Sequence, residues 1–452
     1  MKRIAMRSVT IWILVLLLLG GLGFFMMEYV MYSDQWVLSQ GSPHIYKGDN
    51  INTGVVVDRD GVILLDNTGE RTYSSSKELR SSMIHWLGDR YGYISAPAVA
   101  NYAKEMAGFD VLTGIYSDSV GQASLTLSSR LQLAAQEAIG DRKGTIALMN
   151  YKTGEILCAL SAPNYDPDDV PNMDADDTGA YEGVYMNRFT QSVYIPGSIF
   201  KLVTTAAALE EIEDIREQTF TCTGEQDYGR NDVTCEKAHG TMDFDAVLAR
   251  SCNCSFAQIV EQLGRKTLEK YVEKYKVTQS VTFDGITTAA GNFDLQDCSN
   301  LDVAWSGIGQ HKDQVNPCRY LTFVSTIAND GVEISPYVMQ QVTIDSKETY
   351  RAQTTTVGRI MPEQIAQELH RMMRNNVLSN YGEEGFLDYR VCAKTGTAQV
   401  GGDRQSNAMF TGFIENEECP IAFFIAVEDA GYGRTVCAPI LAKLLEACKE
   451  VL

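Results

Sequence analysis

The chain has 452 residues, 45% hydrophobic and 21% charged, which is the composition of a globular protein without long disordered tracts. This length allows a large catalytic domain and a smaller module. The formal net charge of −20 repels phosphate backbones, so we expect no nucleic-acid partner.

An uncharged apolar run covers residues 9–27 and follows a short basic segment. As a helix this run spans roughly 28 Å, close to the ~30 Å hydrocarbon thickness of a bilayer. The basic flank predicts a cytoplasmic N-terminus and an exported remainder. A cleaved signal peptide is the alternative, but the residues after the run lack a small-residue cleavage pattern. The sequence therefore predicts a single-pass membrane protein with a cytoplasmic tail at 1–8 and a transmembrane anchor at 9–27.

Residues 28–142 are expected to form a small extracytoplasmic module. It opens with a polar exit from the membrane over 28–50. Residues 52–66 predict a hairpin, because β-branched residues flank an Asp-Gly turn. Residues 77–115 have mostly helical apolar spacing, and 123–140 predict a strand followed by an amphipathic helix with a serine-rich start.

The segment from 143 to 452 has the pattern of an α+β domain. Two apolar strands joined by a YKTG turn predict a hairpin near its start, and a loop rich in Asp, Asn and Pro follows. Helices then alternate with short strands until three strands and a closing helix end the chain. Strands at both ends with helices between them predict an antiparallel sheet that joins the first and last segments.

The eleven cysteines are an odd number, so at least one has no partner within the chain. Cys222 and Cys235 flank a polar, glycine-containing loop in an exported region, where a disulfide is expected to close the loop. Cys252 and Cys254 have near-metal spacing, but no second cysteine/histidine pair completes a site. The sequence therefore predicts no metal and no cofactor.

Three short motifs occur in order along this segment: Ser198-Ile-Phe-Lys201, Ser251-Cys-Asn253 and Lys394-Thr-Gly396. Each is weak alone, since a second SxxK stands at 74–77 and a second KTG at 152–154. The former lies in a polar serine run and the latter in the predicted hairpin turn, a common place for such residues.

Ser198 stands where Tyr-Ile-Pro-Gly leads into a buried helical pattern. Residues i and i+3 share a helix face, so Lys201 is expected one turn below Ser198. A lysine on so apolar a helix is desolvated, which lowers its pKa and favours the neutral amine that can take a hydroxyl proton. Ser198 is then an activated nucleophile. The alternative is a serine cap with a snorkelling lysine.

Ser251 and Asn253 reach a cleft from a helix start or a loop. Ser251 is expected to relay a proton between Lys201 and a leaving group, and Asn253 to hold the lysine and donate to a substrate amide. The alternative is an N-cap serine followed by a turn asparagine.

The segment from Lys394 to Thr397 follows apolar residues and is expected on an edge strand facing the cleft. Gly396 permits close approach of a ligand. Lys394 and Thr395 are expected to bind a carboxylate, the first as a point charge and the second by its hydroxyl. The backbone N–H groups of Thr397 and Ser198 would form an oxyanion hole.

This ordered set is typical of penicillin-binding proteins and related β-lactamases. Residues 143–452 resemble the transpeptidase domain of monofunctional (class B) penicillin-binding proteins. Two departures concern the subfamily: Thr53 stands where arginine is common, and His311 where glycine is common. The matching segments are 194–201, 239–240, 249–256, 307–310, 316–317, 327–331 and 394–398.

The resemblance implies a serine D,D-transpeptidase. Ser198 would be acylated by the D-Ala-D-Ala end of a peptidoglycan stem peptide, with release of D-alanine and transfer to an amine of a neighbouring stem. It also implies covalent inhibition by β-lactams at Ser198. Since no glycosyltransferase signature precedes the domain, it further implies a SEDS-type glycosyltransferase as partner.

Three other functions remain open. A β-lactamase or β-lactam sensor shares the motifs, but the Glu-x-x-Leu-Asn segment of class A hydrolysis is not found. A scaffold that activates the glycan polymerase needs no catalysis. A carboxypeptidase differs only in using water as acceptor.

Overall fold

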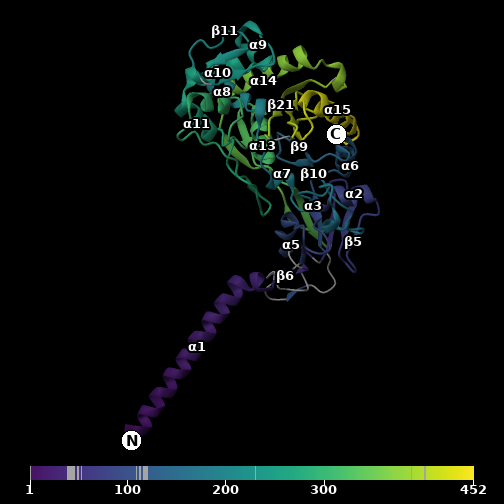
Figure 1. Cartoon of the computed structure of the whole chain (residues 1–452). Helices are drawn as coiled ribbons and strands as arrows, with labels where there is room; N and C mark the ends of the chain where they lie inside the picture. The colour runs from purple at the N-terminus through teal and green to yellow at the C-terminus, as the bar shows by residue number, and fades with distance from the viewer. Residues whose placement is uncertain are drawn as a thin grey trace.

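The computed structural model describes residues 2–37, 46–47, 50–51, 53–107, 109–110, 114–115, 121–229, 231–387, 389–401 and 404–451. Helix α1 (Lys2–Val37) extends away from the folded body (Figure 1). An 18-residue window within its part Arg3–Tyr32 has a mean hydropathy of 2.5 and no buried residues, so the helix is long and apolar enough to cross a membrane.

The predicted apolar run thus lies inside a longer helix. Residues 28–37, expected as a polar exit, are helical, and most of the rest of that exit lies outside the described residues.

A six-stranded sheet forms the part nearest to α1. Its hairpin β3–β4 confirms the hairpin predicted from the sequence, and β8 runs parallel to β3. The strands, in sheet order, are β19 (Lys347–Arg351), β18 (Met339–Ile344), β8 (Gly121–Leu125), β3 (Val55–Val57), β4 (Ile63–Asp66) and β5 (Thr72–Tyr73). Two of these strands, β18 and β19, come from beyond residue 143, so this sheet joins residues from both sides of the boundary expected at 142/143.

Short helices and strands cover the segment expected to be mostly helical over 77–115. That expectation is only half right, because one pair of short strands, β6 and β7, ends the segment. The elements are α2 (Lys77–Ser82), α3 (Ile84–Leu87), α4 (Pro97–Ala100), α5 (Ala103–Ala107), β6 (Phe109–Asp110) and β7 (Gly114–Ile115). Strands β1 (Tyr46–Lys47) and β2 (Asn50–Ile51) precede them.

A five-stranded antiparallel sheet forms the centre of the larger part. It confirms the α+β class and the joining of the first and last segments, with β21 at the edge as predicted. In sheet order the strands are β10 (Ile156–Ala162), β9 (Gly144–Asn150), β23 (Ile421–Val427), β22 (Asn407–Ile414) and β21 (Val391–Ala398).

Helices cover both faces of this sheet, which explains why its inner strands are apolar at nearly every position. In β9, Ala147 and Met149 pack into one core cluster and Ile146 and Leu148 into the other, as strand alternation requires. The first cluster holds α13 (Pro317–Ala328) and α14 (Glu363–Asn380), and the second holds α6 (Ser129–Ile139) and α15 (Gly433–Val451).

The segment between the two halves of this sheet carries most of the site. Its elements are η1 (Met173–Ala175), α7 (Arg188–Gln191), η2 (Gly197–Ile199), α8 (Lys201–Glu211), β11 (Thr219–Cys222), β12 (Glu225–Asp227), β13 (Asp232–Thr234), β14 (Gly240–Asp243), α9 (Phe244–Ala249), α10 (Asn253–Leu263), α11 (Arg265–Lys274), β15 (Thr282–Phe283), β16 (Ile286–Thr287), α12 (Asn300–Gly307), β17 (Val332–Ile334), β20 (Thr356–Arg359) and η3 (Glu384–Phe386).

Candidate active site

Ser198 lies in the 3-10 turn η2, immediately before helix α8. The preceding Gly197 has a φ of 53°, and its N–H donates to the carbonyl of Gly309 at 2.7 Å. A Cβ at Gly197 would lie 2.8 Å from the carbonyl oxygen of Thr397, so the turn packs tightly against β21. The buried helix predicted after Ser198 is confirmed, but it begins at Lys201, and the serine stands in the turn that leads into it.

Lys201 is fully buried, and its Nζ contacts the Ser-Cys-Asn motif. The Nζ donates to Asn253 Oδ1 at 2.7 Å, and to the carbonyl oxygen and Oγ of Ser251 at 2.7 and 3.1 Å. It also lies 5.2 Å from the centre of the Phe256 ring. Burial lowers the pKa of Lys201 to about 7, so a large share of the neutral amine exists near neutral pH.

Ser251 and Asn253 are held by the turn between α9 and α10. Ser251 has a φ of 53°, a left-handed conformation that is uncommon for a residue with a side chain. Asn253 is the first residue of α10, and its Nδ2 donates to the carbonyl of Thr234 at 2.9 Å. The amide is therefore oriented with its oxygen toward Lys201.

Lys394 is 1% exposed and lies on β21. Its Nζ donates to Ser251 Oγ at 3.0 Å and to the carbonyl of Thr395 at 2.9 Å. Burial, and secondly the nearby Lys201, lower the pKa of Lys394 well below its ordinary value. This nitrogen points at Ser251, the expected proton relay, and the carboxylate contact expected of Lys394 stays a prediction.

Thr395 and Thr397 line the cleft, as their predicted role requires. Thr395 Oγ1 lies 2.7 Å from the hydroxyl of Tyr381, which fixes its direction. At Gly396, where close approach of a ligand was expected, the protein's own backbone approaches closely: a Cβ there would lie 2.9 Å from the carbonyl oxygen of Pro196. The glycine thus admits the turn that carries Ser198.

The cleft has a volume of about 760 Å³ and opens over these motifs. Ser198, Ser251 and Asn253 lie on its wall together with Thr395 and Thr397. Most of its other lining residues are polar or aromatic, among them Arg250, Trp305, Gln310, Arg404 and Tyr432. This arrangement brings a hydroxyl nucleophile, a neutral amine base and a second hydroxyl to one polar cleft, which is the equipment for acyl transfer.

The second SxxK and KTG matches lie elsewhere. Lys152 is in the turn between β9 and β10, where its Nζ donates to Asn329 Oδ1 at 3.0 Å. The backbone N–H of Ser74 donates to Leu64, next to the six-stranded sheet. Neither residue lines the cleft.

The sequence does not single out two further residues of the site. Tyr381 follows the C-terminus of α14 and Phe256 lies within α10, and both sit in ordinary helical patterns. Only the packing of these helices against β21 and α8 brings the tyrosine to Thr395 and the phenylalanine to Lys201.

Comparison with known proteins also indicates an acyl-transfer domain of the transpeptidase kind for most of the chain. The family model "Penicillin binding protein transpeptidase domain" matches residues 144–446. Stage V sporulation protein D of Bacillus subtilis is 29% identical over 71% of this chain. The match covers about half (52%) of that relative's length. Peptidoglycan D,D-transpeptidase PbpA of Mycolicibacterium smegmatis is 26% identical over 71% of each chain.

Solved structures share the fold. A D,D-transpeptidase domain of a peptidoglycan glycosyltransferase from Eggerthella lenta superposes with a TM-score of 0.75 at 25% identity, over 88% of this chain and 98% of that one. The penicillin G acyl-enzyme complex of penicillin-binding protein A from M. tuberculosis gives 0.75 at 21% identity, over 88% and 99%. Since the family model covers most of the chain and the curated relatives are class B proteins, this protein belongs to the penicillin-binding protein transpeptidase family, in its class B branch.

Proposed function

We propose that this protein is a peptidoglycan D,D-transpeptidase that uses Ser198 as its nucleophile. The observation that carries the proposal is the position of Lys201: a buried amine with a pKa near 7, bonded to Ser251 and Asn253 at the wall of the cleft that Ser198 lines. PbpA, which is named a peptidoglycan D,D-transpeptidase, supports the substrate class.

In acylation, Ser198 Oγ attacks the carbonyl carbon between the two D-alanines of a stem peptide. Lys201 Nζ accepts the proton of Ser198 as the new C–O bond forms. When the C–N bond breaks, the departing amine of the terminal D-alanine takes a proton that Lys201 supplies through Ser251 Oγ, 3.1 Å away. Lys394, 3.0 Å from the same oxygen, holds Ser251 in position for this transfer.

In the second half, an amine of a neighbouring stem attacks the ester. Its proton passes to Lys201 while the new amide C–N bond forms, and the ester C–O bond breaks as Ser198 Oγ regains a proton. Backbone N–H groups of Ser198 and Thr397 are assigned to the oxyanion of both tetrahedral intermediates. Thr395 and Thr397 are assigned to the terminal carboxylate of the donor.

A β-lactam carries an amide carbonyl and a carboxylate in a similar relation, so it would acylate Ser198 by the same steps. The structure of the M. tuberculosis protein with the same fold holds penicillin G as an acyl-enzyme. The ester would persist because the ring-opened leaving group stays attached and blocks the acceptor.

The proposed arrangement in the cell is a cytoplasmic tail at 1–8, an anchor at 9–27 and catalysis outside the membrane. The basic residues before the apolar part of α1 support this orientation. Residues 28–142 and 143–452 are assigned to the pedestal-like module and the transpeptidase domain. A SEDS-type glycosyltransferase is the proposed membrane partner, since the chain offers no polymerising motif of its own.

Labelling of membranes with a fluorescent penicillin tests the proposal. We expect Ser198→Ala to abolish labelling of this protein and the matched decoy Ser74→Ala to keep it. Retained labelling in Ser198→Ala would refute the nucleophile. Rapid turnover of nitrocefin would favour a β-lactamase, and full viability of cells that carry Ser198→Ala would favour a scaffold.

A further inference from the structure

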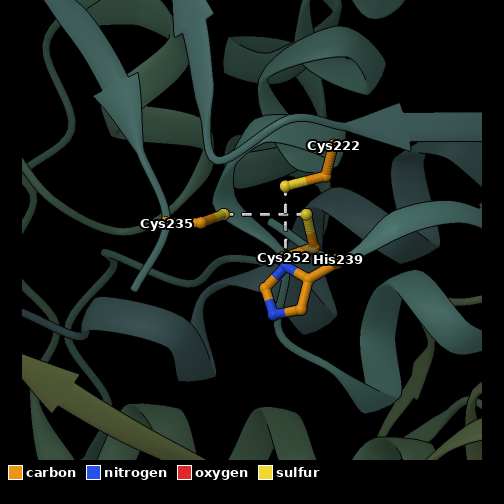
Figure 2. Close-up of side chains that lie close together, drawn as sticks. All are labelled: Cys222, Cys235, His239 and Cys252. Carbon is orange, nitrogen blue, oxygen red and sulfur yellow. Dashed lines mark hydrogen bonds between the residues drawn. The ribbon is translucent and has the colours of Figure 1, made fainter. Parts of the chain in front are cut away.

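Four side chains with metal-binding atoms lie together beside the active site: Cys222, Cys235, His239 and Cys252 (Figure 2). Their three sulfurs and one imidazole nitrogen all lie within 4.8 Å of one another. Cys222 ends β11, Cys235 follows β13, His239 precedes β14 and Cys252 is the N-cap of α10. All three cysteines are free, so the disulfide expected between Cys222 and Cys235 is not present in the structure.

The distances across this cluster agree with tetrahedral zinc coordination. Zinc lies ~2.3 Å from thiolate sulfur and ~2.0–2.1 Å from histidine nitrogen, so tetrahedral angles separate two sulfurs by about 3.8 Å and sulfur from nitrogen by about 3.5 Å. Cys235 Sγ and Cys252 Sγ are 3.7 Å apart, and Cys222 Sγ and His239 Nδ1 are 3.6 Å apart. Figure 2 shows the four side chains converging from different sides on one centre.

Hydrogen-bond donors surround the sulfurs in the way that thiolates require. The backbone N–H of Cys254 donates to Cys235 Sγ at 3.4 Å. Cys252 Sγ accepts from the N–H and the hydroxyl of Ser255, at 3.4 and 3.2 Å. Such second-shell donors orient metal ligands and stabilise their negative charge. Cys222 and Cys252 are buried, at 1% and 0% exposure, whereas Cys235 and His239 are half-buried and lie on the wall of the cleft.

We propose that Cys222, Cys235, His239 and Cys252 bind one zinc ion as a structural site, with the cysteines as thiolates whose protons are released to solvent. Four protein ligands of the Cys3His type close the coordination shell, which is the mark of a structural zinc site. The expectation of no metal site paired Cys252 with Cys254. The structure instead pairs Cys252 with residues from three strand ends and turns Cys254 Sγ toward the carbonyl of Val233, at 3.6 Å.

The zinc site would affect catalysis by holding the Ser-Cys-Asn turn in place beside Lys201. Cys252 stands between Ser251 and Asn253, the two residues that bond Lys201. Asn253 also bonds the carbonyl of Thr234, the residue before Cys235. A zinc ion bound by both Cys235 and Cys252 therefore links the residues next to Thr234 and Asn253, and it holds the Ser-Cys-Asn turn against Lys201. This positioning role rests on the proposed acyl transfer, whereas zinc binding does not.

Elemental analysis of the full-length protein, purified in detergent and reducing buffer without metal-affinity resin, tests the binding. We expect about one zinc per chain, as a closed Cys3His site binds a single ion. Cys222→Ser and Cys235→Ser should lose it, whereas the neighbouring control Cys254→Ser should retain it. If the ligand variants fail to fold, chelation and zinc rebinding by the wild-type chain give the same count, and cobalt substitution should give thiolate-to-cobalt charge-transfer absorption.

Wild-type protein that takes up no zinc under these conditions, a preference for another metal, or a Cys235–Cys252 disulfide found by mass spectrometry would each overturn the site. The positioning role has a separate readout. Removal of zinc should slow acylation by a fluorescent penicillin at least tenfold, and added zinc should restore it. An unchanged rate would overturn positioning alone, and zinc-loaded protein that never labels would instead refute the proposed function.

Discussion

The side-chain nitrogens of Lys201 and Lys394 meet at a single oxygen, Ser251 Oγ, at 3.1 and 3.0 Å. Both lysines are buried, and burial lowers the pKa of each. Two charged ammonium groups at one hydroxyl would repel each other in a site with little solvent. The pair therefore favours at least one neutral amine, which is the form that can take a proton from Ser198.

Replacing Lys201 should remove the base. We expect Lys201→Ala to slow acylation by a fluorescent penicillin at least ~100-fold, the lower range of general-base contributions. Lys152→Ala, in the second KTG motif, should leave the rate unchanged because its side chain contacts Asn329 outside the cleft. Stopped-flow or gel-based labelling rates measure both, and equal rates for the two variants would contradict the assignment of the base.

The acylation rate should rise with pH through about 7 and level off above it. Burial disfavours the charged form of Lys201 and lowers its pKa to about 7, so the reactive neutral amine gains as pH increases. Well below that value the rate should fall about tenfold per pH unit, as for a single titrating base. A rate profile between pH 5 and 9 checks this, and a rate that is still rising about tenfold per pH unit at pH 9 would show that the amine is not desolvated.

Gly197→Ala should weaken acylation without removing any catalytic group. The added Cβ would meet the carbonyl oxygen of Thr397 at 2.8 Å, and a left-handed φ costs roughly 1–2 kcal/mol for other residues. The turn that carries Ser198 must then shift away from β21. Gly385→Ala is the control, since its Cβ would meet nothing within 4 Å. Labelling rates and thermal midpoints that match for the two variants would contradict this tight packing.

Tyr381→Phe should lower the second-order rate of acylation about 2- to 12-fold, the value of one hydrogen bond worth ~0.5–1.5 kcal/mol. The lost hydroxyl bonds Thr395 Oγ1 at 2.7 Å and accepts from its N–H at 3.3 Å, so Thr395 would lose its fixed direction. The pH inflection should not move, because the hydroxyl has no contact with Lys201 among the described residues. Equal rates in the variant and the wild type would show that Thr395 needs no support.

Local pattern predicted the strands and hairpins well. β-branched residues on both sides of Asp60-Gly61 predicted the hairpin β3–β4, and apolar runs predicted β9, β10 and the last three strands. The extent of α1 was underestimated, because helix continues through polar residues once the apolar core of the helix has formed.

The order of the three motifs, the buried helix behind Ser198 and the edge strand of Lys394 could be predicted from the sequence, because each depends on neighbours within a few residues. Three contacts could be found only in the folded chain: Lys394 faces Ser251, Tyr381 supports Thr395, and the side chains of Cys222, Cys235, His239 and Cys252 lie together. These contacts join elements far apart in the chain, and their geometry comes from how sheet and helices pack. Spacing along the sequence carries no record of that packing, so the closeness of Cys252 to Cys254 in the sequence does not predict that Cys252 lies beside Cys222, Cys235 and His239.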